Sequence, residues 1–310
     1  MEIVRYNPSF KGVWDGFVDA SKNGTFLFRR DYMEYHSDRF TDASLLFLEE
    51  GKLRAVFPAS LHGSRIVSHG GLTFGGFVTD LSMTAQTMLR MMEYLVSYWK
   101  GEGLSELLYK RVPAIYHSYP SDEDLYALFR IGAVLAERGL SSTVCLPERI
   151  KYSERRNRSI KKAIHAGIVF KESKDYGSYM GLLSEVLMSR HGIKPAHSAE
   201  EISLLASRFP DNIKLFVASK DGRLLAGTVV YETPLVAHTQ YLANSEEGRN
   251  CGALDFVIDR LITDVYASKR FFDFGISTED GGHFLNEGLV GQKQEFGGRG
   301  VVYDKYLINL

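Results

Sequence analysis

The residues best suited to chemistry lie in residues 271–298, where an acid and a lysine flank a short polar loop. The aromatic run at the start of this segment predicts a strand that carries Asp273. Asn286, Val290 and Lys293 are spaced i, i+4 and i+7, so a helix would place them on one face. We predict a strand–loop–helix unit that forms one wall of a cleft. An ordinary strand–helix unit with a solvated lysine is the alternative.

A basic segment lies in the middle of the chain. Residues 149–174 hold nine lysines and arginines against two glutamates. If Ser153 begins a helix, Arg155, Arg158 and Lys162 form a basic face on it. Arginine and lysine hold phosphates, so this face predicts a rim suited to coenzyme A, a nucleotide-linked sugar or the acceptor end of a tRNA. A solvated helix between domains explains the same pattern.

Four basic or imidazole side chains gather in residues 189–198. They are Arg190, His191, Lys194 and His197. We predict that this loop contacts substrate and that His191 can serve as a general base, because an imidazole exchanges its proton near neutral pH. An ordinary surface histidine is the alternative. The spacing of the histidines suits no common metal motif, so no metal site is expected.

Two blocks in the second half resemble a known family. Asp273-Phe274-Gly275, the run 285–289 (LNEGL), Lys293 and the run 296–298 (FGG) resemble the closing segment of the Fem family. These are peptidyl aminoacyltransferases built from two acyltransferase-like (GNAT) domains. Residues 155–167 resemble that family's entry into its second domain. The resemblance covers about residues 150–310, and the first half matches only in layout.

The resemblance implies an α/β fold of two tandem GNAT-like domains, with mixed, mostly antiparallel sheets flanked by helices. We place the N-terminal domain at 1–147 and the C-terminal domain at 148–310. The last strand, 301–310, could pack back on the first domain. Element order supports a duplication, because hairpins at Glu50-Gly51 and Asp221-Gly222 occupy matching places in the two halves.

Other elements of the first half follow from periodicity. An amphipathic helix capped by Ser82 is expected to run to Trp99, and a further helix from Leu125 to Ala136. A strand over 141–146 closes this half.

The resemblance also implies site residues. GNAT domains bind pyrophosphate at a turn before a helix, and here Arg249, Asn250, Cys251, Gly252 and Ala253 occupy that place. Free backbone N–H groups at a helix start attract anions. Leucine ends the motif where the family has glycine or alanine. That departure fits an enzyme with another acyl carrier, or a purely structural turn.

For the remaining residues, the resemblance gives Lys293 the task of neutralising phosphate or oxyanion charge. Tyr241 and Asp273 would line the pocket at strand ends. We assign catalysis to Lys293, His191 and Asp273. Substrate binding is assigned to Arg155, Arg158, Lys162, Arg190, Lys194, His197, Tyr241 and Asn286.

Composition sets limits on these readings. The chain has 310 residues, of which 45% are apolar and 24% charged, and its net charge is −1. This argues against a nucleic-acid binder driven by overall basicity. Two cysteines are too few for a disulfide framework. Neither an apolar run of membrane-spanning length nor a signal pattern is found, so a cytoplasmic protein is expected.

We therefore predict a transferase that forms an amide on an amine acceptor, with no tightly bound cofactor. The Fem resemblance implies an aminoacyl-tRNA donor and a cell-wall precursor as acceptor. The broader GNAT resemblance allows acyl-CoA and a small amine. The alternative is a non-catalytic GNAT-like scaffold. The sequence leaves the oligomeric state open.

Overall fold

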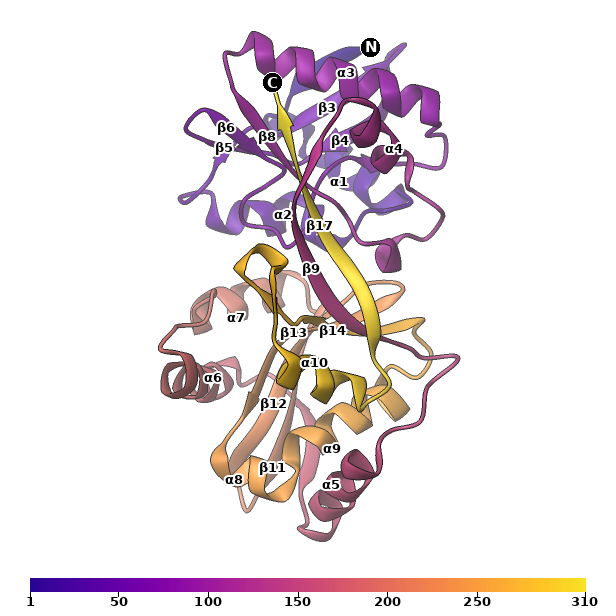
Figure 1. Cartoon of the computed structure of the whole chain (residues 1–310). Coiled ribbons are helices and arrows are strands. Elements are labelled where there is room, and N and C mark those ends of the chain that lie inside the picture. The colour runs from indigo at the N-terminus through magenta and orange to yellow at the C-terminus, as the bar shows by residue number, and fades with distance from the viewer. The chain divides into compact units, whose positions relative to one another are not determined.

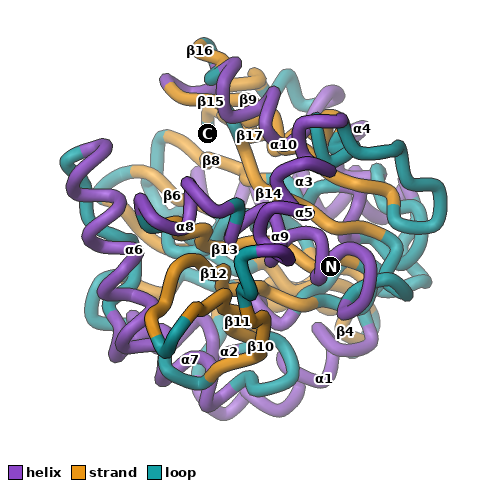
Figure 2. The backbone as a smooth tube through the Cα atoms, turned by 90° about the horizontal axis from the view of Figure 1, so that it is seen from below, coloured by secondary structure: helices purple, strands orange, loops and turns teal.

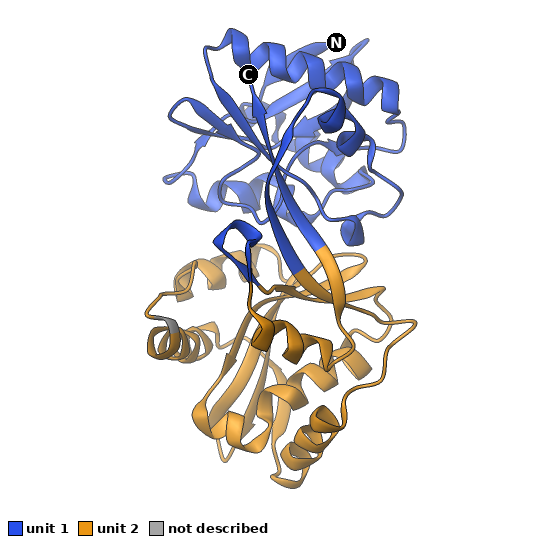
Figure 3. Ribbon diagram, in the orientation of Figure 1, with its two compact units in different colours: residues 1–140, 278–284, 302–310 blue, residues 141–277, 285–301 orange. Residues whose placement is uncertain are grey.

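A computed structural model describes residues 1–310 apart from the side chain of His191. The chain forms two compact units (Figure 3). Unit 1 comprises residues 1–140, 278–284 and 302–310, and unit 2 comprises residues 141–277 and 285–301. Strands β9 (Val134–Cys145) and β17 (Arg299–Asn309), labelled in Figure 1, each contribute residues to both units, as the colours of Figure 3 show. The domain division at 147/148 stays a prediction.

Unit 1 is built on two groups of strands. The first group pairs in the order β1-β3-β4-β7, and the second in the order β9-β17-β8-β6-β5-β2. Its strands are β1 (Glu2–Arg5), β2 (Thr41–Asp42), β3 (Leu45–Glu49), β4 (Lys52–Phe57), β5 (Ser60–His62), β6 (Arg65–Val67), β7 (Val78–Thr79) and β8 (Glu106–Lys110). Its helices are α1 (Lys11–Ala20), α2 (Arg30–Met33), α3 (Ala85–Gly101) and α4 (Glu123–Arg130). The short strands β15 (Thr278–Glu279) and β16 (Phe284–Leu285) pair with each other.

The hairpin predicted at Glu50-Gly51 is confirmed, and both residues have the positive φ that such a turn needs. Two helix bounds in this half were wrong. Helix α3 is capped by Thr84, whose side chain accepts from the N–H of Thr87, and not by Ser82. Helix α4 ends at Arg130 because Gly132 has φ +75°. The segment expected to continue that helix is instead the start of β9.

Unit 2 holds one mixed sheet in the order β10-β11-β12-β13-β14-β9. The strands are β10 (Val169–Ser173), β11 (Ile213–Lys220), β12 (Arg223–Glu232), β13 (Val236–Asn244) and β14 (Phe271–Ile276), followed by the end of β9. The helices are α5 (Glu154–His165), α6 (Tyr176–His191), α7 (Ala199–Arg208), α8 (Glu246–Cys251), α9 (Ala253–Arg260) and α10 (Glu287–Gln294). A π-helical turn, Leu261–Val265, extends α9.

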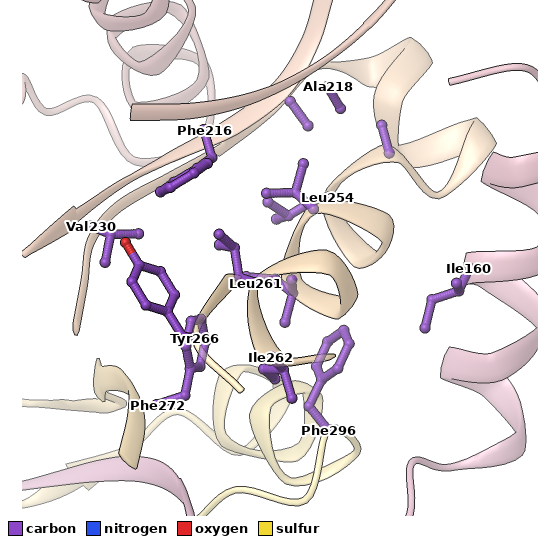
Figure 4. Close-up of a cluster of buried hydrophobic side chains, with 14 of the residues drawn as sticks. Ile160, Phe216, Ala218, Val230, Leu254, Leu261, Ile262, Tyr266, Phe272 and Phe296 are labelled. Atoms are coloured by element: carbon purple, nitrogen blue, oxygen red, sulfur yellow. The ribbon is translucent and has the colours of Figure 1, made fainter. Parts of the chain in front are cut away.

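The two faces of this sheet carry different helices. Alternate strand residues such as Phe216, Val230 and Phe272 pack against α9 in one apolar core, with α5 contributing Ile160 (Figure 4). Helices α6 and α7 contact β11, β12 and β13 and lie on the other side of the strands (Figures 1 and 2). Because side chains alternate along a strand, neighbours of the core residues point toward that second side.

Local sequence signals set several element ends in unit 2. Ser153 caps α5, since its Oγ accepts from the N–H of Arg156 at 3.3 Å. Ser198 and Glu201 form the reciprocal capping box at the start of α7. The Asp221-Gly222 turn joins β11 to β12. The helix start at Ser153 and the Asp221-Gly222 hairpin confirm what was expected from the sequence.

Candidate active site

The site is organised by the one parallel strand pair in unit 2. Strands β13 and β14 pair only over Val236–His238 and Phe271–Asp273, although β13 continues to Asn244. Within β13, a register shift against β12 leaves Gln240 without a Cα partner. Gly275 on β14 has φ +76°, which bends this strand soon after the paired stretch. Ligands of α/β proteins bind beyond the carboxyl ends of parallel strands, so this region is the natural place for a site.

A row of polar side chains crosses three strands at this point. Asp273 is fully buried and accepts from Ser141 Oγ at 2.5 Å, from Thr143 Oγ1 at 2.6 Å and from His238 Nδ1 at 2.7 Å. Burial acts to raise the pKa of Asp273, but the hydrogen bonds and the nearby imidazole outweigh it and lower the pKa below its ordinary value. The result is a buried carboxylate that orients one histidine.

The sequence analysis missed His238. It lies on β13 directly beside Asp273 in the parallel register, and its neighbour Ala237 faces the α9 core. The signal that could have found it is the pairing of the two strands, because a residue's cross-strand neighbour is not visible in a single sequence. The sequence did select Asp273.

Lys293 reaches the same strand from α10. Its side chain is buried, and Nζ donates to the carbonyl oxygens of Gly275 and Ile276 at 2.8 and 2.9 Å and to Ser277 Oγ at 2.8 Å. Burial lowers the pKa of Lys293 to about 8, although the carboxylate of Asp273 opposes that shift. An ammonium has three donors, and these bonds use all of them. The lysine therefore fixes the end of β14.

A pocket of about 440 Å³ opens beside the end of β13. Strand β13 supplies Leu242 and Asn244 to its wall, and α6 supplies Val186 and Leu187. Charged residues from four elements line the rest, namely Arg155, Arg156, Arg190, Arg249 and Asp255. Four arginines against one carboxylate make this pocket suited to an anion, most simply a phosphate.

The four arginines differ in their environments. Arg156 is buried and bonds both oxygens of Asp255 at 2.8 and 2.7 Å and Glu295 at 2.7 Å, so it ties α5 to α9 and α10. Arg155, Arg190 and Arg249 have exposed side chains. These three remain accessible to a ligand that enters the pocket.

A second pocket of about 790 Å³ shares Arg155, Arg156 and Gln292 with the first. It extends between α5 and α10 toward Lys151 and Arg299, and Glu287 and Glu295 also line it. The shared residues mean that the two pockets adjoin. Together they form a longer recess with a basic middle.

The segment predicted to cradle pyrophosphate forms the end of one helix and the start of the next. Arg249, Asn250 and Cys251 form the last turn of α8, and only Gly252 separates α8 from α9. Helix α5 packs against the start of α9, because a Cβ on Gly252 would lie 2.4 Å from the carbonyl oxygen of Ser159 on α5. Gly252 and Ala253 are accordingly buried. Gly252, Leu254 and Asp255 nonetheless line the pocket of about 440 Å³, so this helix start borders it.

The structure brings some of the predicted site residues together and leaves others apart. Arg155, Arg190, Arg249 and Gly252 line one pocket. His197 and Tyr241 meet, with Nδ1 and Oη 2.5 Å apart, and burial raises the pKa of Tyr241 to about 12. Asn286 caps α10 by accepting from the N–H of Leu289 at 3.0 Å.

Other predicted residues lie on the surface or outside the described part of the chain. Arg158 and Lys162 are exposed on α5, and Lys194 is exposed on the loop before α7. Ile164 on the same helix is also exposed. The side chain of His191 is not among those described, so its predicted role as a base stays a prediction.

Two findings concern what is absent from the residues that the structure describes. Among them, no group of three or more His, Cys, Asp or Glu side chains could hold a metal ion. No helix within the same residues is long and apolar enough to cross a bilayer.

Comparison with known proteins identifies the fold. Residues 148–282 match a family model described as an acetyltransferase (GNAT) domain. No curated protein sequence matches the chain. The crystal structure of FemX is similar over 100% of this chain and 98% of its own, with a TM-score of 0.71 and 13% identity.

Two further solved structures share the architecture. L-PGS from Bacillus licheniformis is 12% identical and covers 98% of this chain and 91% of its own, with a TM-score of 0.62. A tandem GNAT protein from the clavulanic acid biosynthesis pathway is 12% identical over 99% and 98%, with a TM-score of 0.51. The predicted α/β fold of tandem GNAT-like domains is thus confirmed. The GNAT match also supports acyl or aminoacyl transfer as the general type of reaction.

Proposed function

Since this chain is a Fem-like protein of tandem GNAT fold, we propose that it transfers an aminoacyl group from a tRNA to an amine, forming an amide. The amine acceptor is proposed to be a cell-wall precursor, as the Fem-like fold suggests. Both substrates belong to the cytoplasm, which is where we propose that the protein acts.

The observation that carries this proposal is the arginine-lined pocket of about 440 Å³. Arg155, Arg190 and Arg249 present exposed guanidinium groups there, and guanidinium groups pair with phosphate through two parallel hydrogen bonds. The adjoining second pocket continues the recess past Arg155. A carrier with several phosphates in a row, such as the acceptor end of a tRNA, fits such a recess.

The packing of Ser159 against the start of α9 favours tRNA over coenzyme A. A pyrophosphate held by backbone N–H groups needs an open helix start. Here the carbonyl oxygen of Ser159 lies against Gly252 and brings its partial negative charge to the place that the pyrophosphate would occupy.

A second candidate function is acyl transfer from coenzyme A. The match of residues 148–282 to a GNAT acetyltransferase domain favours it. In this case, the pocket arginines would bind the phosphates of the coenzyme without help from the α9 helix start.

Donor binding tests the proposal. Purified protein is titrated with alanyl-tRNA, with deacylated tRNA and with acetyl-CoA at several salt concentrations. We expect alanyl-tRNA to bind and acetyl-CoA to bind at least tenfold more weakly. Each phosphate contact to a single strand adds about 0.7 to the slope of log K against log salt. Arg190→Ala and Arg249→Ala should therefore each weaken binding and reduce that slope.

Arg223→Ala is the matched control, because Arg223 is an exposed arginine of unit 2 on the β11–β12 hairpin and is not among the residues that line the pocket. It should leave tRNA affinity and salt slope unchanged. Tight binding of acetyl-CoA that depends on Arg190 would replace the tRNA donor with the second candidate. Binding of neither carrier would leave the scaffold interpretation.

A further inference from the structure

We propose that His238 is the general base that removes the proton from the attacking amine, an inference that rests on the proposed amide-forming function. It is carried by a geometric arrangement of four side chains on β13, β14 and β9, without use of the pocket arginines.

The two ring nitrogens of His238 have different environments. His238 Nδ1 lies 2.7 Å from a carboxylate oxygen of Asp273, and a carboxylate only accepts. The Nδ1 atom therefore carries the proton, and Nε2 of the neutral ring holds the lone pair. Within the described residues, Nε2 has no protein hydrogen-bond partner, and the side chain is 12% exposed. A lone pair that solvent can reach is what a base requires.

The pair formed by His238 and Asp273 is held in place by its neighbours. Asp273 also accepts from Ser141 and Thr143 of β9, so its carboxylate is held from two neighbouring strands. Gly275 lies against the imidazole ring, since a Cβ at this position would be 3.3 Å from His238 Cε1. A base held in a single orientation does not need to be ordered during the reaction.

The location of His238 and Asp273 in the sheet also fits a role in catalysis. His238 and Asp273 are the last paired residues of the parallel strands β13 and β14, at the edge beyond which ligands bind in α/β folds. Their neighbours Ala237 and Phe272 belong to the α9 core, so the pair faces the opposite side of the sheet.

Amide formation makes one C–N bond, breaks one C–O bond and moves one proton. The amine nitrogen attacks the carbonyl carbon of the donor ester, forming the C–N bond and a tetrahedral oxyanion. Nε2 of His238 takes the proton that the nitrogen must lose. The oxyanion then re-forms the carbonyl, the C–O bond to the carrier breaks, and its electron pair leaves with the carrier oxygen. The imidazolium returns the proton to that oxygen, so His238 ends neutral.

The charged groups near the imidazole favour this role. Asp273 is the carboxylate on the neighbouring strand, and it stabilises the imidazolium formed in the step. The ammonium of Lys293, on α10, interacts with the same carboxylate and is bound to the backbone of β14.

The test is single-turnover transfer from radiolabelled alanyl-tRNA to a lysine-containing cell-wall pentapeptide. His238→Ala should slow transfer by about 100-fold or more, the usual contribution of a general base, with tRNA affinity unchanged. Free imidazole should restore part of the rate. Asp273→Asn should also slow transfer and alter the pH profile. His165→Ala is the control, because His165 is an exposed histidine at the end of α5.

Chemical modification tests the geometry independently of activity. Diethyl pyrocarbonate acylates accessible neutral imidazoles, and mass spectrometry locates the product. We expect His238 to be modified, and bound alanyl-tRNA to protect it. A transfer rate within threefold of wild type for His238→Ala, or a His238 that resists the reagent while His165 reacts, would overturn the inference. Failure of the proposed function looks different, because wild-type protein would then bind no carrier while His238 still reacted.

Discussion

Replacing Arg156 by alanine should destabilise unit 2 strongly. Arg156 and Asp255 are 7% and 8% exposed, and two hydrogen bonds of 2.7 and 2.8 Å join them. Removal of one partner leaves the other charge buried and uncompensated, which costs about 3–5 kcal/mol. The lost bond to the partly exposed Glu295 adds less than about 1 kcal/mol. We expect the free energy of unfolding to fall by about 3–5 kcal/mol.

The assay must report on unit 2. Both tryptophans, Trp14 and Trp99, lie in unit 1, so tryptophan fluorescence follows the wrong part of the chain. Urea unfolding is therefore monitored by far-ultraviolet circular dichroism together with hydrogen exchange of the α9 amides. The exchange data give the opening free energy of the helix that Arg156 anchors.

Arg155 provides the matched control on the same helix. Its side chain is exposed, and its ion pair with Glu295 spans 3.6 Å, so Arg155→Ala should change stability by less than about 0.5 kcal/mol. The reasoning is refuted if Arg156→Ala lies within 1 kcal/mol of wild type, or if both variants destabilise unit 2 equally. In either case, Arg156 would not be the structural member of the arginine group.

Two further predictions concern stability, each measured by urea unfolding. A lysine whose pKa is lowered in the folded state binds fewer protons there than it does in the unfolded chain. Lys293 should therefore make the free energy of unfolding rise between pH 8 and 10.5, by up to about 1.4 kcal/mol per pH unit. Lys293→Met should lack this rise, and an identical pH slope in both proteins would contradict it. Gly252→Ala should cost about 2 kcal/mol or more, because φ is +80° and the new Cβ would meet Ser159 backbone. Gly181→Ala, on an open face of α6, should be neutral or stabilising by up to about 1 kcal/mol, and equal effects of the two glycine variants would refute the packing argument.

Local signals predicted much of unit 2. The Asp221-Gly222 turn, the Ser153 cap and the Ser198 capping box depend on residues within a few positions of each other, and all were readable from sequence. The end of α4 was not, because the periodic pattern continued past Gly132, whose positive φ stops the helix.

The candidate site was only partly predictable because its contacts are long-range. Asp273 was selected, but its partners Ser141, Thr143 and His238 come from other strands, and sheet register decides which residues meet. The family resemblance gave Lys293 a catalytic role in neutralising phosphate or oxyanion charge, and the structure adds three hydrogen bonds from its ammonium to β14 and the following residue. The spacing of residues along a helix predicts which side chains share one face of it. It does not predict which hydrogen-bond acceptors of other elements lie against that face.

At the predicted pyrophosphate turn, the residue types were readable from the sequence, whereas their packing was not. Its residue types matched a familiar pattern, and Gly252 does sit at a helix start with φ +80°. What the sequence did not contain was the position of α5, whose Ser159 packs against that helix start. Tertiary packing thus decides whether a helix end can bind an anion.

The most direct test of the central claim is transfer itself. Wild-type protein is incubated with radiolabelled alanyl-tRNA and a lysine-containing cell-wall pentapeptide, and in parallel with radiolabelled acetyl-CoA, and amide products are identified by mass spectrometry. The proposed function predicts an alanyl amide from the tRNA, reduced by Arg190→Ala and Arg249→Ala and unchanged by Arg223→Ala. An acetyl amide from coenzyme A, with no product from the tRNA, would contradict it.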